Sequence, residues 1–97
     1  MINDNTPTTI RFYKNQIQNI CYSGTNLNIK FNQIRKQIEL LIEHLKKTKR
    51  ISNELIENIN IRLNFIIEDK IAIENDEQLY KQVDKIFDFL MQEIYPN

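Results

Sequence analysis

The chain has 97 residues, 41% of them hydrophobic, with one glycine, two prolines, one cysteine and 13 acidic against 13 basic residues. Its length fits one domain with a modest core, and so few glycines and prolines favour long helices joined by short connections. The lone cysteine excludes an internal disulfide, and the short apolar runs exclude a transmembrane helix.

The first predicted helix covers residues 8–23, after a polar lead-in that ends at Pro7. Gly24 should end it, because glycine adopts the left-handed conformation of a helix C-terminus at little cost. The apolar spacing of three to four residues is that of one helix face. This face consists of Ile10, Tyr13, Ile17, Ile20 and Cys21.

The second predicted helix covers residues 27–48 and has the most regular pattern in the chain. Thr25 or Asn26 precedes it and offers a side-chain oxygen as an N-cap. Its apolar residues alternate at spacings of four and three, which is a heptad seam. The seam residues are Leu27, Phe31, Ile34, Ile38, Leu41 and Leu45.

The third predicted helix covers residues 53–70, with Ser52 as its N-cap. The pattern over 71–75 is ambiguous, because this segment suits either a last helical turn or a short extended connection. The apolar seam of the third helix consists of Leu55, Ile59, Leu63 and Ile66.

The fourth predicted helix covers residues 76–94 and begins with a capping box formed by Asn75 and Gln78. Its seam consists of Leu79, Val83, Ile86, Leu90 and Ile94. Four amphipathic helices with short connections predict an all-α fold, an antiparallel up-down-up-down four-helix bundle that forms a single domain over 1–97.

Charge is unevenly distributed along the chain. Residues 1–50 carry nine Lys or Arg against three Asp or Glu, whereas residues 51–97 carry four against ten. The two halves should therefore attract each other when they pack. A uniformly basic nucleic-acid-binding protein would have a different charge pattern, so no nucleic-acid partner is expected.

The N-terminus lacks the basic and apolar regions of a signal peptide, which favours a cytoplasmic location.

The sequence offers no recognisable catalytic chemistry. His44 is the only histidine and has no second metal ligand at helical spacing, so we expect a solvated side chain. Cys21 lies on the apolar face of the first helix, which favours a small core residue over a nucleophile. A single glycine leaves no phosphate-binding loop. We therefore expect no enzyme activity, no cofactor and no metal site.

Some apolar residues fall on the polar faces of the predicted helices. Ile61 and Phe65, one turn apart, should face outward, and Phe89 should project from the fourth helix. Together they could form one apolar partner surface on the acidic half. Alternatively, wider helix faces bury them, or they lie in a homodimer seam. The other outward apolar residues are Phe12, Ile29 and Leu40.

Taken in chain order, these features resemble those of the immunity proteins against pediocin-like bacteriocins, the enterocin A immunity type. The resemblance is mainly in LIENINIRLNFIIEDKIAIENDEQLYKQVDKIFDFL, residues 55–90, with FYKNQI and the long seam helix upstream. It lies in pattern, length and spacing over about 85 residues. Family members often continue past the last helix with a tail, whereas this sequence ends at Tyr95-Pro96-Asn97, which leaves any role of a tail in doubt.

The resemblance implies a cytoplasmic protein of a Gram-positive bacterium that protects the cell from a cognate bacteriocin. Such proteins act at the inner face of the mannose phosphotransferase permease that the bacteriocin targets, and their specificity is attributed to the C-terminal half. For this chain, the implied partner-binding residues are Ile61, Phe65, Lys70, Ile71, Phe89 and Tyr95. We expect a monomer or a weak homodimer.

Two other functional classes remain open. A small phage- or plasmid-type regulator or antitoxin would bind another protein or nucleic acid, and a purely structural dimer would bind itself. A salt-dependent affinity for DNA would favour the regulator.

Four cations lie within five residues where the second predicted helix ends: Lys46, Lys47, Lys49 and Arg50. Cations at a helix C-terminus offset the negative end of its dipole. Four exceed what this role requires, so the run is also a candidate contact with an anionic membrane surface.

Overall fold

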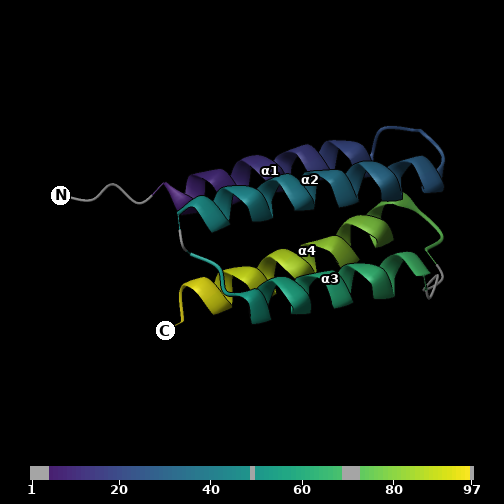
Figure 1. Ribbon diagram of the computed structural model, residues 1–97. Helices are drawn as coiled ribbons and strands as arrows, with labels where there is room; N and C mark the ends of the chain where they lie inside the picture. The colour runs from purple at the N-terminus through teal and green to yellow at the C-terminus, as the bar shows by residue number, and fades with distance from the viewer. Residues whose placement is uncertain (1–4, 49, 69–72, 97) are drawn as a thin grey trace.

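The computed structural model describes residues 5–48, 50–68 and 73–96. This part of the chain contains four helices, α1 (Thr6–Cys21), α2 (Leu27–Lys47), α3 (Asn53–Glu68) and α4 (Asp76–Ile94). They alternate in direction, with α1 and α2 as one layer and α3 and α4 as the other, in a bundle about 45 Å long and 23 Å wide (Figure 1). The predicted antiparallel four-helix bundle is confirmed.

The helix boundaries differ from the predicted ones mainly in α1, which begins and ends two residues earlier. Pro7 lies inside its first turn rather than in a lead-in, because the missing N–H would have no helical acceptor there. Residues 73–75 are not helical, and α3 ends at Glu68. The predicted residues 69–70, like 71 and 72 of the ambiguous connection, lie outside the described part of the chain.

The core consists of the apolar seams that face the bundle axis. Burying them supplies the main driving force for folding. Three predicted seam residues lie outside it: Leu27 is 38% exposed, and Ile20 and Ile94 are half-buried. Leu27 and Ile94 are terminal helix residues, where neighbouring helices cover less of the side chain. The remaining seam residues are buried, including Ile17, Ile34, Leu45, Ile59, Leu63, Leu79 and Leu90.

The predicted N-caps are present, whereas Gly24 lies two residues beyond the C-cap of α1, Tyr22, and not directly after it. Asn26 Oδ1 accepts a 2.9 Å hydrogen bond from Ile29 N, and Ser52 Oγ accepts one of 3.1 Å from Leu55 N. Asn75 Oδ1 accepts from Gln78 N at 2.9 Å, but Gln78 Oε1 accepts from the backbone N of Glu74 rather than that of Asn75. The capping box at α4 is therefore extended by one residue. Each cap satisfies an N–H group that has no acceptor within its helix.

Ion pairs join the basic half of the chain to the acidic half. Lys14 Nζ on α1 lies 2.7 Å from Asp84 Oδ1 on α4, and Lys30 Nζ on α2 lies 2.7 Å from Asp76 Oδ1 on α4. Lys30 is buried, with 4% of its surface exposed. These contacts agree with the expected attraction between the two halves, and they fix α4 against the α1–α2 layer.

Candidate interaction surface

Two apolar side chains on α3 point away from the core, as the sequence predicted. Ile61 is 58% exposed and Phe65 is 55% exposed, and they lie one helical turn apart. Phe89 on α4 differs from the prediction, because it is half-buried and packs against the core. The guanidinium carbon of Arg62 lies 3.9 Å from the centre of the Phe89 ring, so a cation covers this aromatic side chain.

A shallow pocket of about 210 Å³ lies between α3 and α4 beside these residues. The buried side chains of Ile66 and Ile86 contribute to its lining. The remaining lining residues are Ile61, Arg62, Phe65, Gln82 and Lys85. We define the α3/α4 surface as this pocket together with Phe89. Its volume is enough for roughly one apolar side chain and is below the usual range of small-molecule sites.

The rim of the α3/α4 surface is cationic. Arg62 and Lys85 are exposed, and neither forms an ion pair with another described residue. Lys81, the remaining cation of α4, is 3.4 Å from Glu77 on its own helix. Among its described residues, the acidic half of the chain therefore carries two uncommitted cations beside its most exposed apolar side chains. Sequence analysis identified the apolar residues but did not predict this cationic rim, because Arg62 and Lys85 come together only where α3 packs on α4.

Of the remaining predicted partner residues, the structure describes only Tyr95. Lys70 and Ile71 lie outside the described residues. Tyr95 directly follows α4, where it is half-buried, and it does not line the pocket.

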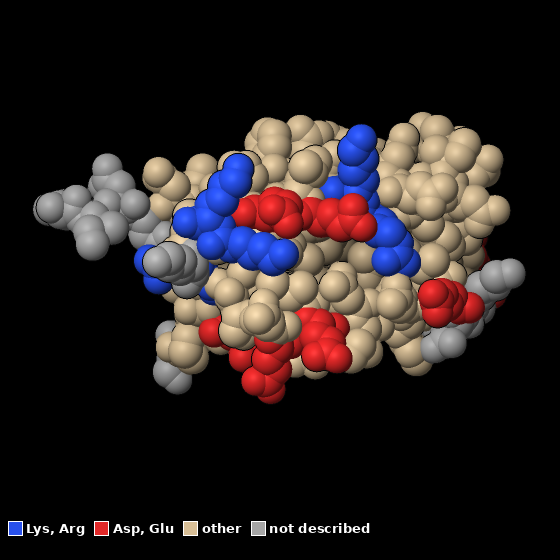
Figure 2. All heavy atoms as spheres, viewed as in Figure 1, with Lys and Arg blue, Asp and Glu red and all other residues tan. Residues whose placement is uncertain are grey.

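The basic run at the end of α2 forms a separate surface. Lys46, Lys47 and Arg50 are exposed, and Figure 2 shows cations gathered where α2 ends. Lys46 and Lys47 occupy the last turn of α2, where they offset its dipole, and Lys46 Nζ lies 3.5 Å from Glu43 Oε1. Lys49 lies outside the described residues. None of the described helices is long and apolar enough to cross a membrane.

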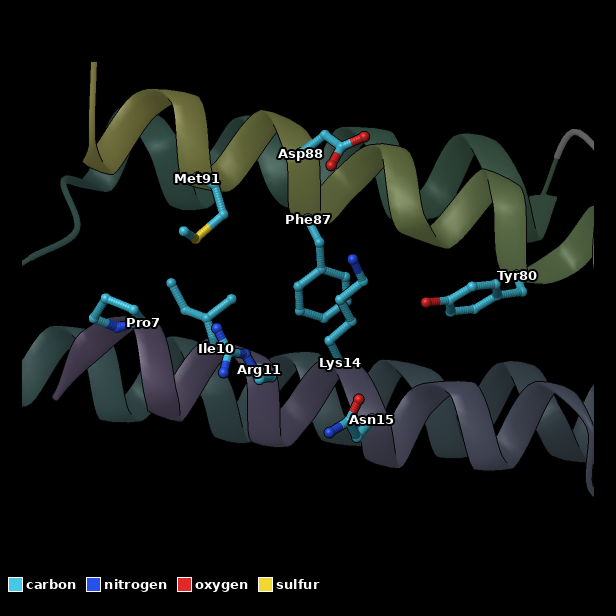
Figure 3. Close-up of a pocket in the computed structure, with 9 residues that line it drawn as sticks. All are labelled: Pro7, Ile10, Arg11, Lys14, Asn15, Tyr80, Phe87, Asp88 and Met91. Atoms are coloured by element: carbon cyan, nitrogen blue, oxygen red, sulfur yellow. The ribbon is translucent and has the colours of Figure 1, made fainter. Parts of the chain in front are cut away.

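A groove of about 330 Å³ between α1 and α4 was not expected from the sequence. Ile10, Phe87 and Met91 line its apolar part, and Figure 3 shows the side chain of Lys14 extending from α1 towards α4. The hydrogen bond and ion pair with Asp84 raise the pKa of Lys14, so this cation is already neutralised within the chain. Arg11 and Asp88 contribute opposite charges to the lining, which leaves it balanced.

A third groove, of about 440 Å³, lies between α2 and α3. Leu40 lies on it and is exposed, as predicted. The charged lining residues are again balanced: Lys36, Glu39, Glu43 and Lys46. The α3/α4 surface is thus the one of these three hollows whose charged lining has a single sign.

Cys21 and His44 lie where the sequence indicated, in the core and at the surface respectively. Cys21 is fully buried, and this burial raises the pKa of its thiol to about 11, so the reactive thiolate is disfavoured. His44 is exposed, and its ring centre lies 5.8 Å from that of Tyr13. The described residues contain no cluster of three or more His, Cys, Asp or Glu that could hold a metal ion.

Comparison with known proteins gave no match. No family model, no curated protein and no solved structure matches this chain. The geometry of the α3/α4 surface and the pattern of the sequence therefore carry the functional conclusion.

Proposed function

We propose that this chain is a cytoplasmic immunity protein of the pediocin-like bacteriocin type. It protects a bacteriocin producer, or a relative of one, by binding at the inner face of the complex between the mannose phosphotransferase permease and the bacteriocin. It acts by recognition and not as an enzyme. The observation that carries the proposal is the exposure of Ile61 and Phe65 on the C-terminal half of a four-helix bundle.

Exposed apolar side chains at adjacent helical turns suit a protein-binding role. Removing Ile61 and Phe65 from water on binding would supply affinity, and the neighbouring Arg62 is of a residue type enriched at the energetic centres of interfaces. The bundle holds these side chains on one well-packed helix, α3, so little ordering is needed when the partner binds. This arrangement matches the C-terminal specificity that the sequence resemblance implies.

The basic end of α2 offers a second contact for a protein that works beside a membrane. Lys46, Lys47 and Arg50 would meet the anionic headgroups of the inner leaflet, at roughly 1 kcal/mol for each cation near the surface. This contact would be weak by itself and sensitive to salt. It would add to binding at the α3/α4 surface by keeping the protein close to the permease.

Expression in a bacteriocin-sensitive strain tests the proposal. We expect cells that produce the protein to survive at least one of a panel of pediocin-like bacteriocins that kills control cells carrying the empty vector. The double variant Ile61→Ser/Phe65→Ser should express equally and fail to protect. Unchanged killing by every bacteriocin in the panel would contradict immunity. Salt-dependent retention of the purified protein on DNA would instead favour a helical regulator.

A further inference from the structure

We infer that the α3/α4 surface binds an amphipathic helix of a partner protein that carries carboxylates beside its apolar positions. This inference rests on the proposed function in that both assign the partner to the same surface. It adds the chemistry of the partner, which follows from the uncommitted Arg62 and Lys85.

The shape of the surface suits a helix. Ile61 and Phe65 are four residues apart on α3 and form a ridge beside the pocket between α3 and α4. A partner helix with apolar residues at the same spacing can interdigitate with this ridge, as helices do when they pack. One of its apolar side chains can enter the 210 Å³ pocket. This is the helix-in-groove mode of recognition.

The charges of the surface select the partner. Arg62 lies against the Phe89 ring, and this contact holds the guanidinium in place. Its N–H donors form no hydrogen bond or ion pair with another described residue, so they can bind a carboxylate in the bidentate geometry that arginine favours. Lys85 offers a second cation from the α4 side. A partner with carboxylates flanking its apolar stripe therefore matches the surface, and one with lysines there is repelled.

The surroundings favour a discrete acidic helix over an anionic membrane. Exposed carboxylates also lie on α3 and α4 outside the pocket lining, among them Glu57, Glu68, Asp88 and Glu93. A flat anionic bilayer would extend past the pocket over more of these two acidic helices, whereas a single helix can lie on the cationic rim alone.

A matched pair of peptides tests the inference. Both are short amphipathic helical peptides with identical leucines at i and i+4, and the flanking positions carry glutamate in one and lysine in the other. We expect the glutamate peptide to bind the full chain about tenfold more tightly at low salt, and added salt to reduce the difference. Backbone amide shifts in an NMR titration should change most around Ile61, Phe65 and Lys85.

A charge-reversal variant provides the decisive test. Arg62→Glu with Lys85→Glu should invert the preference, so that the lysine peptide binds more tightly. The control Arg11→Glu with Lys36→Glu makes the same charge change at exposed positions on α1 and α2 and should keep the original preference. Circular dichroism and thermal melting verify that each variant is folded.

Several outcomes would overturn the inference. These are equal binding of the two peptides, a preference that survives charge reversal, and shifts that map to α1 and α2. If the protein binds phosphatidylglycerol vesicles and the charge reversal abolishes that binding, the ligand of this surface is a membrane and not a helix. If the protein self-associates and the charge reversal abolishes the self-association, the ligand is a second copy of the chain. If the peptide preference holds but cells are not protected, immunity fails and the inference stands. If cells are protected but the two peptides bind equally, the inference fails and the proposed immunity function stands.

Discussion

The ammonium of Lys30 lies 2.7 Å from a carboxylate oxygen of Asp76, and this ion pair joins the first turn of α2 to the first turn of α4. The two partners differ in exposure, since 5% of the Lys30 side chain is exposed against 46% for Asp76. Asp76 also lies at the positive end of the α4 dipole. The pair is therefore asymmetric, because the buried lysine needs the aspartate as its counter-ion, whereas the exposed aspartate is also stabilised by water and the helix dipole.

Removing either partner should reveal this asymmetry. Asp76→Ala leaves a buried ammonium without a counter-ion and should lower the free energy of unfolding by about 3 kcal/mol. Lys30→Met removes the buried charge, keeps the volume of the side chain and should change the free energy of unfolding by no more than about 1 kcal/mol. Urea denaturation measures both values. A larger decrease in the free energy of unfolding for Lys30→Met than for Asp76→Ala would contradict this asymmetry.

The buried thiol of Cys21 should make stability depend on pH in the alkaline range. Its pKa is about 11 in the folded protein against an ordinary value of 9.0, so the folded state holds this proton more tightly than the unfolded state does. The stabilisation is complete below pH 9 and is lost as the pH rises towards 11, with a loss of about 1 kcal/mol by pH 10. We expect Cys21→Ala to remove this part of the alkaline decline, as measured by urea denaturation at pH 8 and pH 10.

The pKa of Lys14 is also raised, and its contribution provides a control for the Cys21 measurement. A raised lysine pKa stabilises the fold until the pH exceeds the folded value, which here lies above 10.5. The alkaline decline in the free energy of unfolding that remains in Cys21→Ala should therefore appear mainly above pH 10.5. An identical decline in both proteins between pH 8 and pH 10 would contradict the assignment to the thiol.

Gly24 should resist substitution because of its backbone and not because of its surroundings. Its φ is +80°, and a Cβ added there would meet no atom within 4 Å. Gly24→Ala should therefore destabilise the protein by about 1 kcal/mol through left-handed strain, which lowers the melting temperature of a domain of this size by about 4–8 °C. Gly24→Asn should lower it less, because asparagine adopts this conformation more easily. Equal melting temperatures for all three proteins would argue against this strain.

Phe65 and Phe12 form a matched pair for testing the interaction surface. Both are 55% exposed, but Phe65 lies on the α3/α4 surface and Phe12 lies on α1. Phe65→Ser and Phe12→Ser should each change the free energy of unfolding by no more than about 1 kcal/mol. Under the proposed function, we expect only Phe65→Ser to abolish protection against the bacteriocin. Loss of protection in both variants, with both proteins folded, would mean that the partner contacts more than one face of the bundle.

The sequence predicted the helices well because their periodicity and their caps are local signals. A seam at spacings of three and four places Ile34, Ile38 and Leu41 on one face, whatever packs against it. Ser52 and Asn75 act through backbone groups a few residues away, so their roles were also readable from the sequence, whereas the structure chose Asn26 over Thr25. Leu27 was misassigned because periodicity cannot show where a neighbouring helix stops covering a side chain.

The sequence by itself determined the number of helices, their apolar faces and the outward position of Ile61 and Phe65, because each depends on residues within a few turns of one another. Only the tertiary structure decided which side chains from different helices meet. The packing of α3 on α4 covers Phe89 with Arg62 and brings Lys85 to the same pocket. The packing of α4 against the α1–α2 layer buries Lys30 beside Asp76. These contacts join residues far apart in the chain, and helix periodicity does not specify the distances between helices.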